Sequence, residues 1–238
     1  NEPGRTEWEG FETATHAAAA GGVTTVVDMP LNSIPPTTSL SGLKTKKNAL
    51  ANKMWIDVGL WGGVVPNNLE ELSPMIKAGT LGFKAFMIDS GVVEFPEVDP
   101  TYLYLVMEHL SQEKVPLLVH AECKGDSNQD TPMGDPHHYS TYLASRPEEW
   151  EIKAIRLLVE GVKKTGCHVH IVHLSAASAI PILAQARADG LPITVETCPH
   201  YLSLSSEHIP VGATPFKCAP PIRDENNRIG LWSGLVHG

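Results

Sequence analysis

Short β-rich runs alternate with helical patterns along the chain, and this alternation limits the possible folds more than any other feature. A strand that reaches its neighbour through a helix pairs with that neighbour in parallel. The sequence therefore predicts an α/β fold built on a parallel sheet. The runs that we interpret as strands are 23–28, 56–60, 82–87, 116–120, 168–173 and 191–196.

The helical patterns between these runs carry ordinary start and stop signals. Asp99-Pro100 is typical of an N-cap followed by a first-turn proline, and Gly166 is typical of a helix end. Asn67 or Asn68 is expected to cap a further helix. The connection 122–145 is too long for an ordinary loop, and we interpret it as a functional flap or an insertion. Other helices are expected at roughly 10–20, 40–53, 176–188 and 222–236.

The position of the polar residues favours one kind of α/β fold. Polar side chains recur at the carboxyl ends of the predicted strands, where barrel enzymes hold their chemistry. No glycine-rich nucleotide-binding loop follows any strand. We therefore expect a (β/α)8 TIM barrel with about six strands present, as a single partial barrel domain over residues 1–238. Because the chain opens without Met and stops directly after a helical pattern, we interpret it as a piece truncated at both ends.

The charge balance argues against two classes of partner. Lys and Arg number 18 against 27 Asp and Glu, and the net charge of −9 does not suit nucleic acid or an anionic membrane. No apolar run approaches the ~18 residues of a membrane span. We expect a soluble, cytoplasmic protein, with a peroxisomal or mitochondrial location as the alternatives, because the true termini are not visible. Buried, inert thiols are expected at Cys123, Cys167, Cys198 and Cys218.

Three of the predicted strands carry an ionisable residue among apolar ones. Lys84 lies inside Gly-Phe-Lys-Ala-Phe, His120 ends Leu-Leu-Val-His, and His173 ends His-Ile-Val-His. The alternation of a strand places His173 on the same face as Val169 and Ile171. If these faces point into the barrel, one lysine and two histidines converge at its C-terminal mouth.

The lysine is the strongest of these three signals. A single histidine at a strand end is more often a satisfied polar residue than a ligand. A buried ammonium without a partner, however, costs several kcal/mol. Lys84 must therefore be ion-paired, or neutral and chemically used. Together with His120 and His173, it favours a functional site.

The other histidines are weaker candidates. His168-x-His170 resembles a metal-binding pair, but both residues lie near the start of the predicted strand and on the face opposite His173. We expect them at the bottom or outside of the barrel, where residues serve stability. His200 either lines the substrate or supports the residues that do. Solvated or structural positions are expected for His16, His137 and His138.

Seven motifs, in order and at suitable spacing, make the chain resemble the cyclic amidohydrolases, the family of dihydroorotases, hydantoinases, dihydropyrimidinases and allantoinases. Three of them surround the residues above: Gly-Phe-Lys84, Val-His120-Ala-Glu122 and Val-His173-Leu-Ser. The other four are Asn-Glu-Pro-Gly-Arg5-Thr-Glu-Trp8-Glu-Gly-Phe, Val-Asp28-Met-Pro-Leu-Asn32, Glu196-Thr-Cys-Pro-His200-Tyr and Lys217-Cys-Ala-Pro-Pro-Ile-Arg-Asp224.

The resemblance implies a metal-dependent barrel enzyme. It assigns Lys84 as a carboxylated lysine, formed with CO2, that bridges two divalent metal ions, usually zinc, and it assigns His120 and His173 as ligands of one metal. Such a carbamate has two anionic oxygens that can span metals ~3.5–4 Å apart, and imidazole suits zinc. The family's His-x-His pair should precede Asn1 and its last acidic residue should follow Gly238. We therefore expect the fragment alone to be inactive, and its small β domain, built from the chain ends, to be absent.

Within this family the motifs are most similar to those of the allantoinases. Met-Pro-Leu-Asn32, Asn1 and Ala219 each depart from the dihydroorotase pattern. The resemblance implies hydrolysis of allantoin to allantoate in purine breakdown, with Asn32, Cys218 and Ala219 bordering this small-molecule substrate. Arg5 and Arg223 are expected to be structural or to support the site.

Other readings stay open. The activity could instead be that of a hydantoinase, a dihydropyrimidinase or a dihydroorotase. A non-catalytic scaffold protein of the same fold is a further alternative, although such relatives generally lose ligands and Lys84, His120 and His173 are all present. A natural truncated, inactive isoform is a third. The family also implies a homo-oligomer, most often a tetramer.

Overall fold

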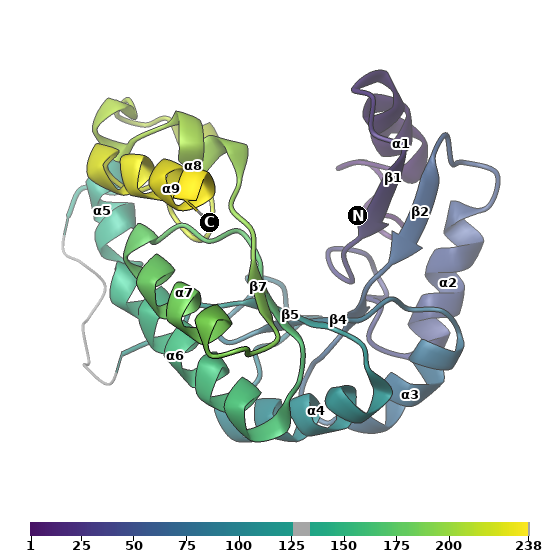
Figure 1. The fold of residues 1–238 in the computed structure, drawn as a ribbon. Coiled ribbons are helices and arrows are strands. Elements are labelled where there is room, and N and C mark those ends of the chain that lie inside the picture. The colour runs from purple at the N-terminus through teal and green to yellow at the C-terminus, as the bar shows by residue number, and fades with distance from the viewer. Residues whose placement is uncertain (126–133, 238) are drawn as a thin grey trace. The chain divides into compact units, whose positions relative to one another are not determined.

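The structure, a computed structural model, describes residues 1–125 and 134–237 (Figure 1). The chain divides into two compact units, Asn1–Leu118 and Val119–Gly238. Each unit contains parallel strands and the helices that pack on them. A single barrel domain over residues 1–238 stays a prediction.

The first unit contains two short parallel pairs of strands. β1 pairs with β2 from Thr25 opposite Asp57 to Asp28 opposite Leu60. β3 pairs with β4, with Gly63 opposite Lys84. Its elements are α1 (Phe11–Ala20), β1 (Thr25–Asp28), α2 (Leu40–Leu50), β2 (Asp57–Leu60), β3 (Gly62–Gly63), α3 (Leu69–Lys77), β4 (Phe83–Phe86), α4 (Pro100–Glu113) and the start of β5 (Leu117–His120).

Close approach of the backbone fixes β4 beside the chain that enters β5. The amide of Phe83 donates to the carbonyl of Pro116 at 3.0 Å. A Cβ on Gly82 would lie 2.5 Å from the same carbonyl oxygen, so only glycine fits there. The core of this unit contains the fully buried side chains of Leu43, Leu72, Met75, Phe83, Leu103, Val106, Met107 and Leu110.

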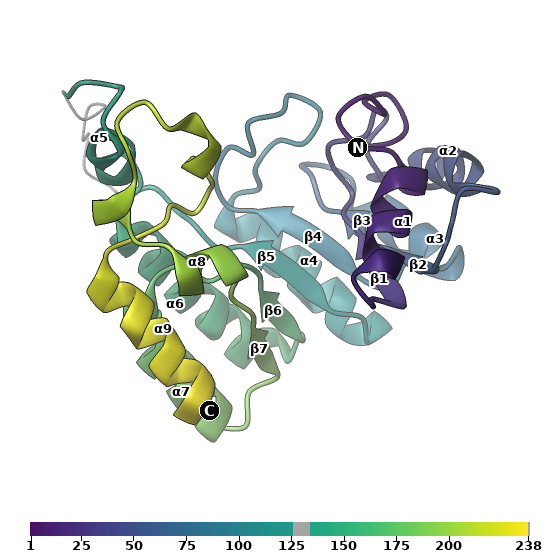
Figure 2. The ribbon, with the colours of Figure 1, turned by 90° about the horizontal axis from the view of Figure 1, so that it is seen from above.

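The second unit has the same parallel architecture. β6 pairs with β7 from Val169 opposite Ile193 to Ile171 opposite Val195, and α6 and α7 run side by side (Figures 1 and 2). Beside the end of β5, its elements are α5 (Tyr139–Ala144), α6 (Glu148–Thr165), β6 (Val169–Ile171), α7 (Ile180–Ala188), β7 (Ile193–Val195), α8 (Pro199–Ser203) and α9 (Glu225–His237). Single 3-10 turns lie at Ala177–Ala179, Ser206–His208 and Thr214–Phe216.

Helix α6 is the organising helix of the second unit. Its buried side chains recur at helical spacing, as at Ile155, Leu158 and Val162, and form one apolar face. Gly166 ends it in the left-handed conformation, with φ of 68°, and donates its amide to the carbonyl of Val162. Across the described ranges, no helix is long and apolar enough to cross a membrane.

The helix signals in the sequence are largely confirmed, with one exception. The Asp99 carboxylate accepts hydrogen bonds from the amides of Thr101 and Tyr102, as expected of an N-cap. Asn68, by contrast, precedes α3 but makes no side-chain capping bond. Its amide group instead bonds the backbone of Val65, Thr38 and Gly63, because these loops lie within reach in the folded chain.

Three other expectations are corrected by the structure. The predicted strand 168–173 is only Val169–Ile171, and the last predicted helix begins at Glu225 rather than near residue 222. The connection 122–145 is not wholly a loop, because α5 forms within it. Part of that connection, 126–133, lies outside the described residues, so the expected flap is not described there. Helix α8 begins at Pro199, in a stretch for which the sequence pattern predicts no helix.

Candidate functional site

Lys84 lies in the middle of β4 in the first unit, and the residue is 3% exposed. Its neighbours Phe83 and Ala85 are fully buried. The Nζ atom lies 5.1 Å from the centroid of the Phe86 ring. The structure therefore confirms a buried lysine in an apolar strand.

His120 and His173 come together in the second unit, as expected from their places at two strand ends. His120 is the last residue of β5 and is 3% exposed. The centroids of the two rings are 4.7 Å apart and the rings meet edge to face. His120 Nδ1 lies 3.2 Å from His173 Nε2.

The backbone that carries His173 differs from the predicted strand. Strand alternation predicts one face shared by His173, Val169 and Ile171, but β6 ends at Ile171. His173 has a φ of 44°, a left-handed conformation that is uncommon for a residue with a side chain. Strand alternation therefore does not set the direction of its ring. Such backbone strain is typical of functional sites, where the surrounding structure holds it in place.

A buried carboxylate lies behind the ring of His120. The Glu122 side chain is fully buried, and its Oε2 atom is 2.6 Å from His120 Nε2 and 2.5 Å from Arg146 Nη1. Burial raises the pKa of the Glu122 carboxyl, and the guanidinium of Arg146 acts in the opposite direction. A carboxylate paired with a guanidinium accepts hydrogen bonds, and an imidazole that donates to it from Nε2 carries its proton there. The lone pair on His120 Nδ1 then faces His173.

This geometry fits a divalent cation held by two imidazoles. Nitrogen ligands bind zinc at about 2.0–2.1 Å in a tetrahedral arrangement, which places two of them about 3.3 Å apart. The observed separation of His120 Nδ1 and His173 Nε2, 3.2 Å, agrees with that value. Among residues 1–125 and 134–237, no group of three or more His, Cys, Asp or Glu side chains is arranged to hold a metal. In the second unit, two histidine nitrogens therefore lie at a separation that suits one cation.

A second buried ion pair anchors the chain that follows His173. Glu151, near the start of α6, pairs with Arg223 at 2.6 Å, and both side chains are less than a tenth exposed. The other carboxylate oxygen of Glu151 accepts hydrogen bonds from the amides of Ser175 and Ala176. Arg223 also donates to the backbone carbonyl of Arg146. This arrangement agrees with the structural or supporting role expected of Arg223.

Asn32, the candidate substrate residue of the first unit, lies on a loop held by Arg5. Arg5 donates to the carbonyl of Asn32 at 2.8 Å and forms a 2.8 Å ion pair with Glu94. Its guanidinium lies 5.0 Å from the ring centroid of Trp8. Arg5 therefore positions the backbone at Asn32, in agreement with the structural role expected for it.

Cys218 and Ala219, the candidates of the second unit, lie on a segment fastened by tyrosine hydroxyls. Tyr142 donates to the carbonyl of Cys218 and Tyr201 donates to that of Pro220, each at 2.6 Å. Burial raises the pKa of Tyr142 to about 12, so its hydroxyl keeps its proton and acts as a donor. Ala219 itself is exposed, as a residue that borders a substrate would be.

The remaining histidines make local contacts. His168 and His170 both contact the hydroxyl of Thr194, and His170 also pairs with Glu196 at 3.2 Å. These bonds tie β6 to β7, which agrees with the stabilising role expected of this pair. Elsewhere, His16 packs on Trp55, His138 lies 3.8 Å from Asp135, and His200 packs on Tyr201.

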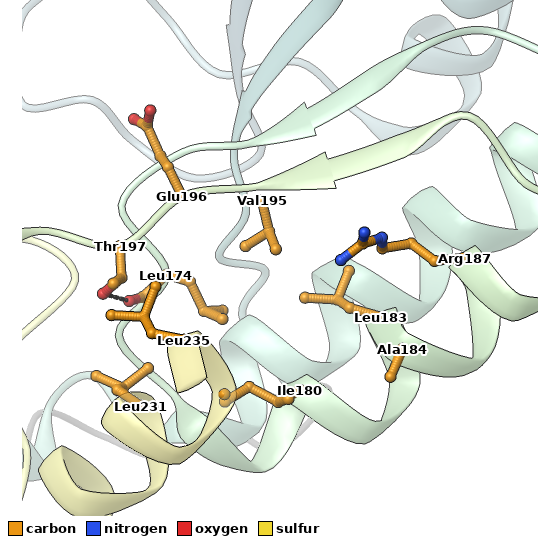
Figure 3. A pocket seen from close by; sticks show the side chains of 11 residues that line it. Leu174, Ile180, Leu183, Ala184, Arg187, Val195, Glu196, Thr197, Leu231 and Leu235 are labelled. Carbon is orange, nitrogen blue, oxygen red and sulfur yellow. Dashed lines mark hydrogen bonds between the residues drawn. The ribbon is translucent and has the colours of Figure 1, made fainter. Parts of the chain in front are cut away.

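One hollow of about 330 Å³ lies between β7, α7 and α9 in the second unit (Figure 3). Leu231 and Leu235 of α9 line it together with Ile180 and Leu183 of α7. The residues around it include neither the expected metal ligands nor the expected substrate residues. Because none of those residues line this hollow, it is not a candidate for the predicted site.

Three residues around the histidine pair have no role that the sequence pattern predicts: Glu122, Arg146 and Glu151. A signal for the first was available, because Glu122 stands two residues after a candidate ligand at a strand end, and such ligands usually donate to a carboxylate. No signal was available for Arg146 or Glu151. Arg146 lies 24 residues after its partner Glu122, and Glu151 lies 24 residues before its partner Ser175. Only the fold brings each of these pairs into contact.

The chain is similar to known amidohydrolases along its length. Residues 1–213 match the Amidohydrolase family. Over its whole length the chain is 52% identical to an allantoinase of Saccharomyces cerevisiae and 51% identical to a mitochondrial allantoinase of Aquarana catesbeiana. It covers 53% and 49% of those proteins, and so spans about half their length.

Solved structures give the same answer for the fold. An L-hydantoinase (dihydropyrimidinase) from Arthrobacter aurescens superposes with a TM-score of 0.86 at 30% identity, over 96% of this chain and 51% of that one. A D-hydantoinase from a Thermus species superposes with a TM-score of 0.84 at 25% identity, over the same shares. The parallel strands and alternating helices are thus part of a TIM barrel. With its buried strand lysine and paired histidines, the chain belongs to the amidohydrolase family.

Proposed function

We propose that the chain is part of a metal-dependent hydrolase that opens the hydantoin ring of allantoin to give allantoate. The observation that carries this proposal is the similarity to allantoinases of yeast, frog, bacteria and plants along the full length of the chain. The substrate-side motifs around Asn32 and Cys218 support the same choice. The solved hydantoinases favour one second candidate, the hydrolysis of other hydantoins or dihydropyrimidines.

We propose that Lys84, His120 and His173 are the metal ligands that this chain contributes, with zinc as the metal. When bound, the ions supply a Lewis acid for the ring carbonyl and lower the pKa of a bound water. Lys84 suits the bridging role because a desolvated, neutral amine can add CO2 and release a proton, which gives a carbamate with two anionic oxygens. The separation of the two histidine nitrogens, 3.2 Å, supports a shared cation in the second unit.

We propose that Asn32, Cys218 and Ala219 border the substrate ring. Arg5 holds the carbonyl of Asn32, and Tyr142 holds the carbonyl of Cys218. Both contacts restrict the backbone of the loops that carry the proposed substrate residues. Pre-organised groups of this kind lower the free energy needed to orient a substrate.

The test uses the whole protein, purified and loaded with zinc, and measures its hydrolysis of allantoin, dihydroorotate and a 5-substituted hydantoin in parallel. We expect allantoin to be the preferred substrate and about two zinc ions per chain by elemental analysis. The Lys84→Ala variant should lose activity and metal, whereas Lys44→Ala, on an exposed position of α2, should retain both.

Three outcomes would contradict parts of this proposal. Turnover of hydantoin without turnover of allantoin would overturn the substrate. An active, metal-loaded Lys84→Ala variant would overturn the bridging role of Lys84. If the whole protein is stable without metal and binds a protein partner, the result would favour a non-catalytic scaffold protein.

We further propose a homotetramer and a cytoplasmic location. Tetramer formation is measured by light scattering of the whole protein during gel filtration. The location is measured by fractionation of the source cells, with mitochondria as the alternative because the frog relative is described as mitochondrial.

A further inference from the structure

We propose that Glu122, held by Arg146, is a positioning residue that fixes the ring of His120 and so strengthens cation binding by His120 and His173. This inference rests on the proposed function, because it takes the two histidines as metal ligands. It adds a role for two residues that neither the motifs nor the comparisons assign.

The direction of the His120 ring is set by its contact with Glu122. An imidazole on a strand end can rotate about its side-chain bonds and can carry its proton on either nitrogen. The 2.6 Å contact from His120 Nε2 to Glu122 Oε2 restricts both choices, because the carboxylate accepts a hydrogen bond from a protonated Nε2. In the ring orientation that makes this contact, His120 Nδ1 faces His173 Nε2 at 3.2 Å.

Glu122 is itself held in place by contacts with Arg146 and with the start of α6. Arg146, two residues before α6, donates to the same carboxylate oxygen at 2.5 Å. The amide of Cys123, which follows Glu122 in the chain, donates to the carbonyl of Trp150 in the first turn of α6. The carboxylate is therefore fastened to the start of α6 by a side-chain contact and by a main-chain contact.

The chain that carries His173 is held by the same helix, α6. The chain just beyond His173 donates the amides of Ser175 and Ala176 to Glu151 in α6. The start of α6 is thus a common support for the segments that carry both rings. Rigid support of this kind holds ligands at their bound separation before the cation arrives, and so reduces the ordering cost of binding.

Burying the Glu122 carboxylate has a cost in folding free energy. The Oε1 atom of Glu122 is buried and accepts no hydrogen bond from residues 1–125 or 134–237. A buried ion pair of this kind contributes little to stability compared with apolar side chains of the same volume. The benefit of Glu122 is therefore expected in the orientation of His120 rather than in the stability of the fold.

The experiment measures zinc affinity of the whole protein by competition with a chelator, together with its melting temperature and the visible absorption of its Co²⁺ form. Glu122→Ala should weaken zinc binding about 10–100-fold, the usual effect of removing a carboxylate behind a histidine ligand. Glu122→Gln should lose less, because its amide carbonyl oxygen can still accept a hydrogen bond from His120 Nε2–H. The Co²⁺ absorption of Glu122→Ala should shift, because the ring of His120 is no longer held.

The matched control is Glu2→Gln, which removes another buried carboxylate that bonds one lysine and one backbone amide, those of Lys53 and Phe11. It should lower the melting temperature and leave zinc affinity and the Co²⁺ spectrum unchanged. A loss of stability alone therefore cannot imitate the expected result.

The outcomes separate this inference from the function on which it rests. If the wild-type protein binds no divalent cation, the proposed function fails. If the wild type binds zinc and Glu122→Ala binds it within threefold as tightly, the positioning role is overturned. If Glu122→Ala does not fold, the zinc affinity of Arg146→Gln tests the same positioning role. Weaker zinc binding by this variant supports the proposal, and unchanged binding overturns it.

Discussion

The ion pair between Glu151 and Arg223 gives the sharpest prediction about stability. Glu151 is 2% exposed, and its carboxylate accepts hydrogen bonds from Arg223 at 2.6 Å and from the amides of Ser175 and Ala176 at 2.9 and 3.2 Å. Glu151→Gln keeps an acceptor for the two amides but removes the carboxylate that pairs directly with the buried Arg223 guanidinium. Breaking a buried pair in this way costs about 3–5 kcal/mol.

This free energy converts to a large shift in melting temperature. For domains of about 150–250 residues, 1 kcal/mol corresponds to roughly 2–4 °C, so Glu151→Gln should lower the melting temperature by about 6–20 °C. Differential scanning calorimetry of the whole protein measures the shift. The control is Glu149→Gln on the exposed side of the same helix, which should change the stability by less than about 0.5 kcal/mol.

A double-mutant cycle tests whether the pair itself is responsible. Arg223→Gln should also destabilise the protein, but the double variant should lose at least about 1 kcal/mol less than the sum, because residues in direct contact do not act additively. Additive losses, or a shift for Glu151→Gln as small as that of Glu149→Gln, would refute the reasoning.

Two further predictions concern ionisable groups outside the candidate site. Burial raises the pKa of Glu2, but its bonds to Lys53 and to the amide of Phe11 outweigh burial and leave the pKa below its ordinary value of 4.5. Glu2 therefore stabilises the fold above pH 4.5 and stops doing so as the pH falls through the lowered pKa, so urea unfolding of Glu2→Gln should depend less on pH between 5 and 3. Burial also raises the pKa of the Cys167 thiol to about 12. At pH 8 this cysteine should react with iodoacetamide at least about tenfold more slowly than Cys123, Cys198 and Cys218, which are only half-buried, and mass spectrometry of labelled peptides measures the difference.

The sequence by itself determined the order of elements and several of their ends. Alternating strand and helix patterns, the Asp99 N-cap and the Gly166 helix end depend on residues close together in the chain, and the structure confirms them. Lys84, His120 and His173 were also found from sequence, because an ionisable residue in an apolar strand is unusual wherever the strand lies.

Only the tertiary structure decided how the histidine pair is held. His173 leaves β6 in a left-handed conformation, so period-two alternation could not give the direction of its ring. Arg146 reaches Glu122 and Arg223 reaches Glu151 across 24 and 72 residues of chain. Sequence patterns report which face of an element is apolar, whereas the pairing of buried charges depends on which elements pack together. That pairing is set only when the chain folds, since a buried carboxylate bonds whichever cation the packing brings within reach.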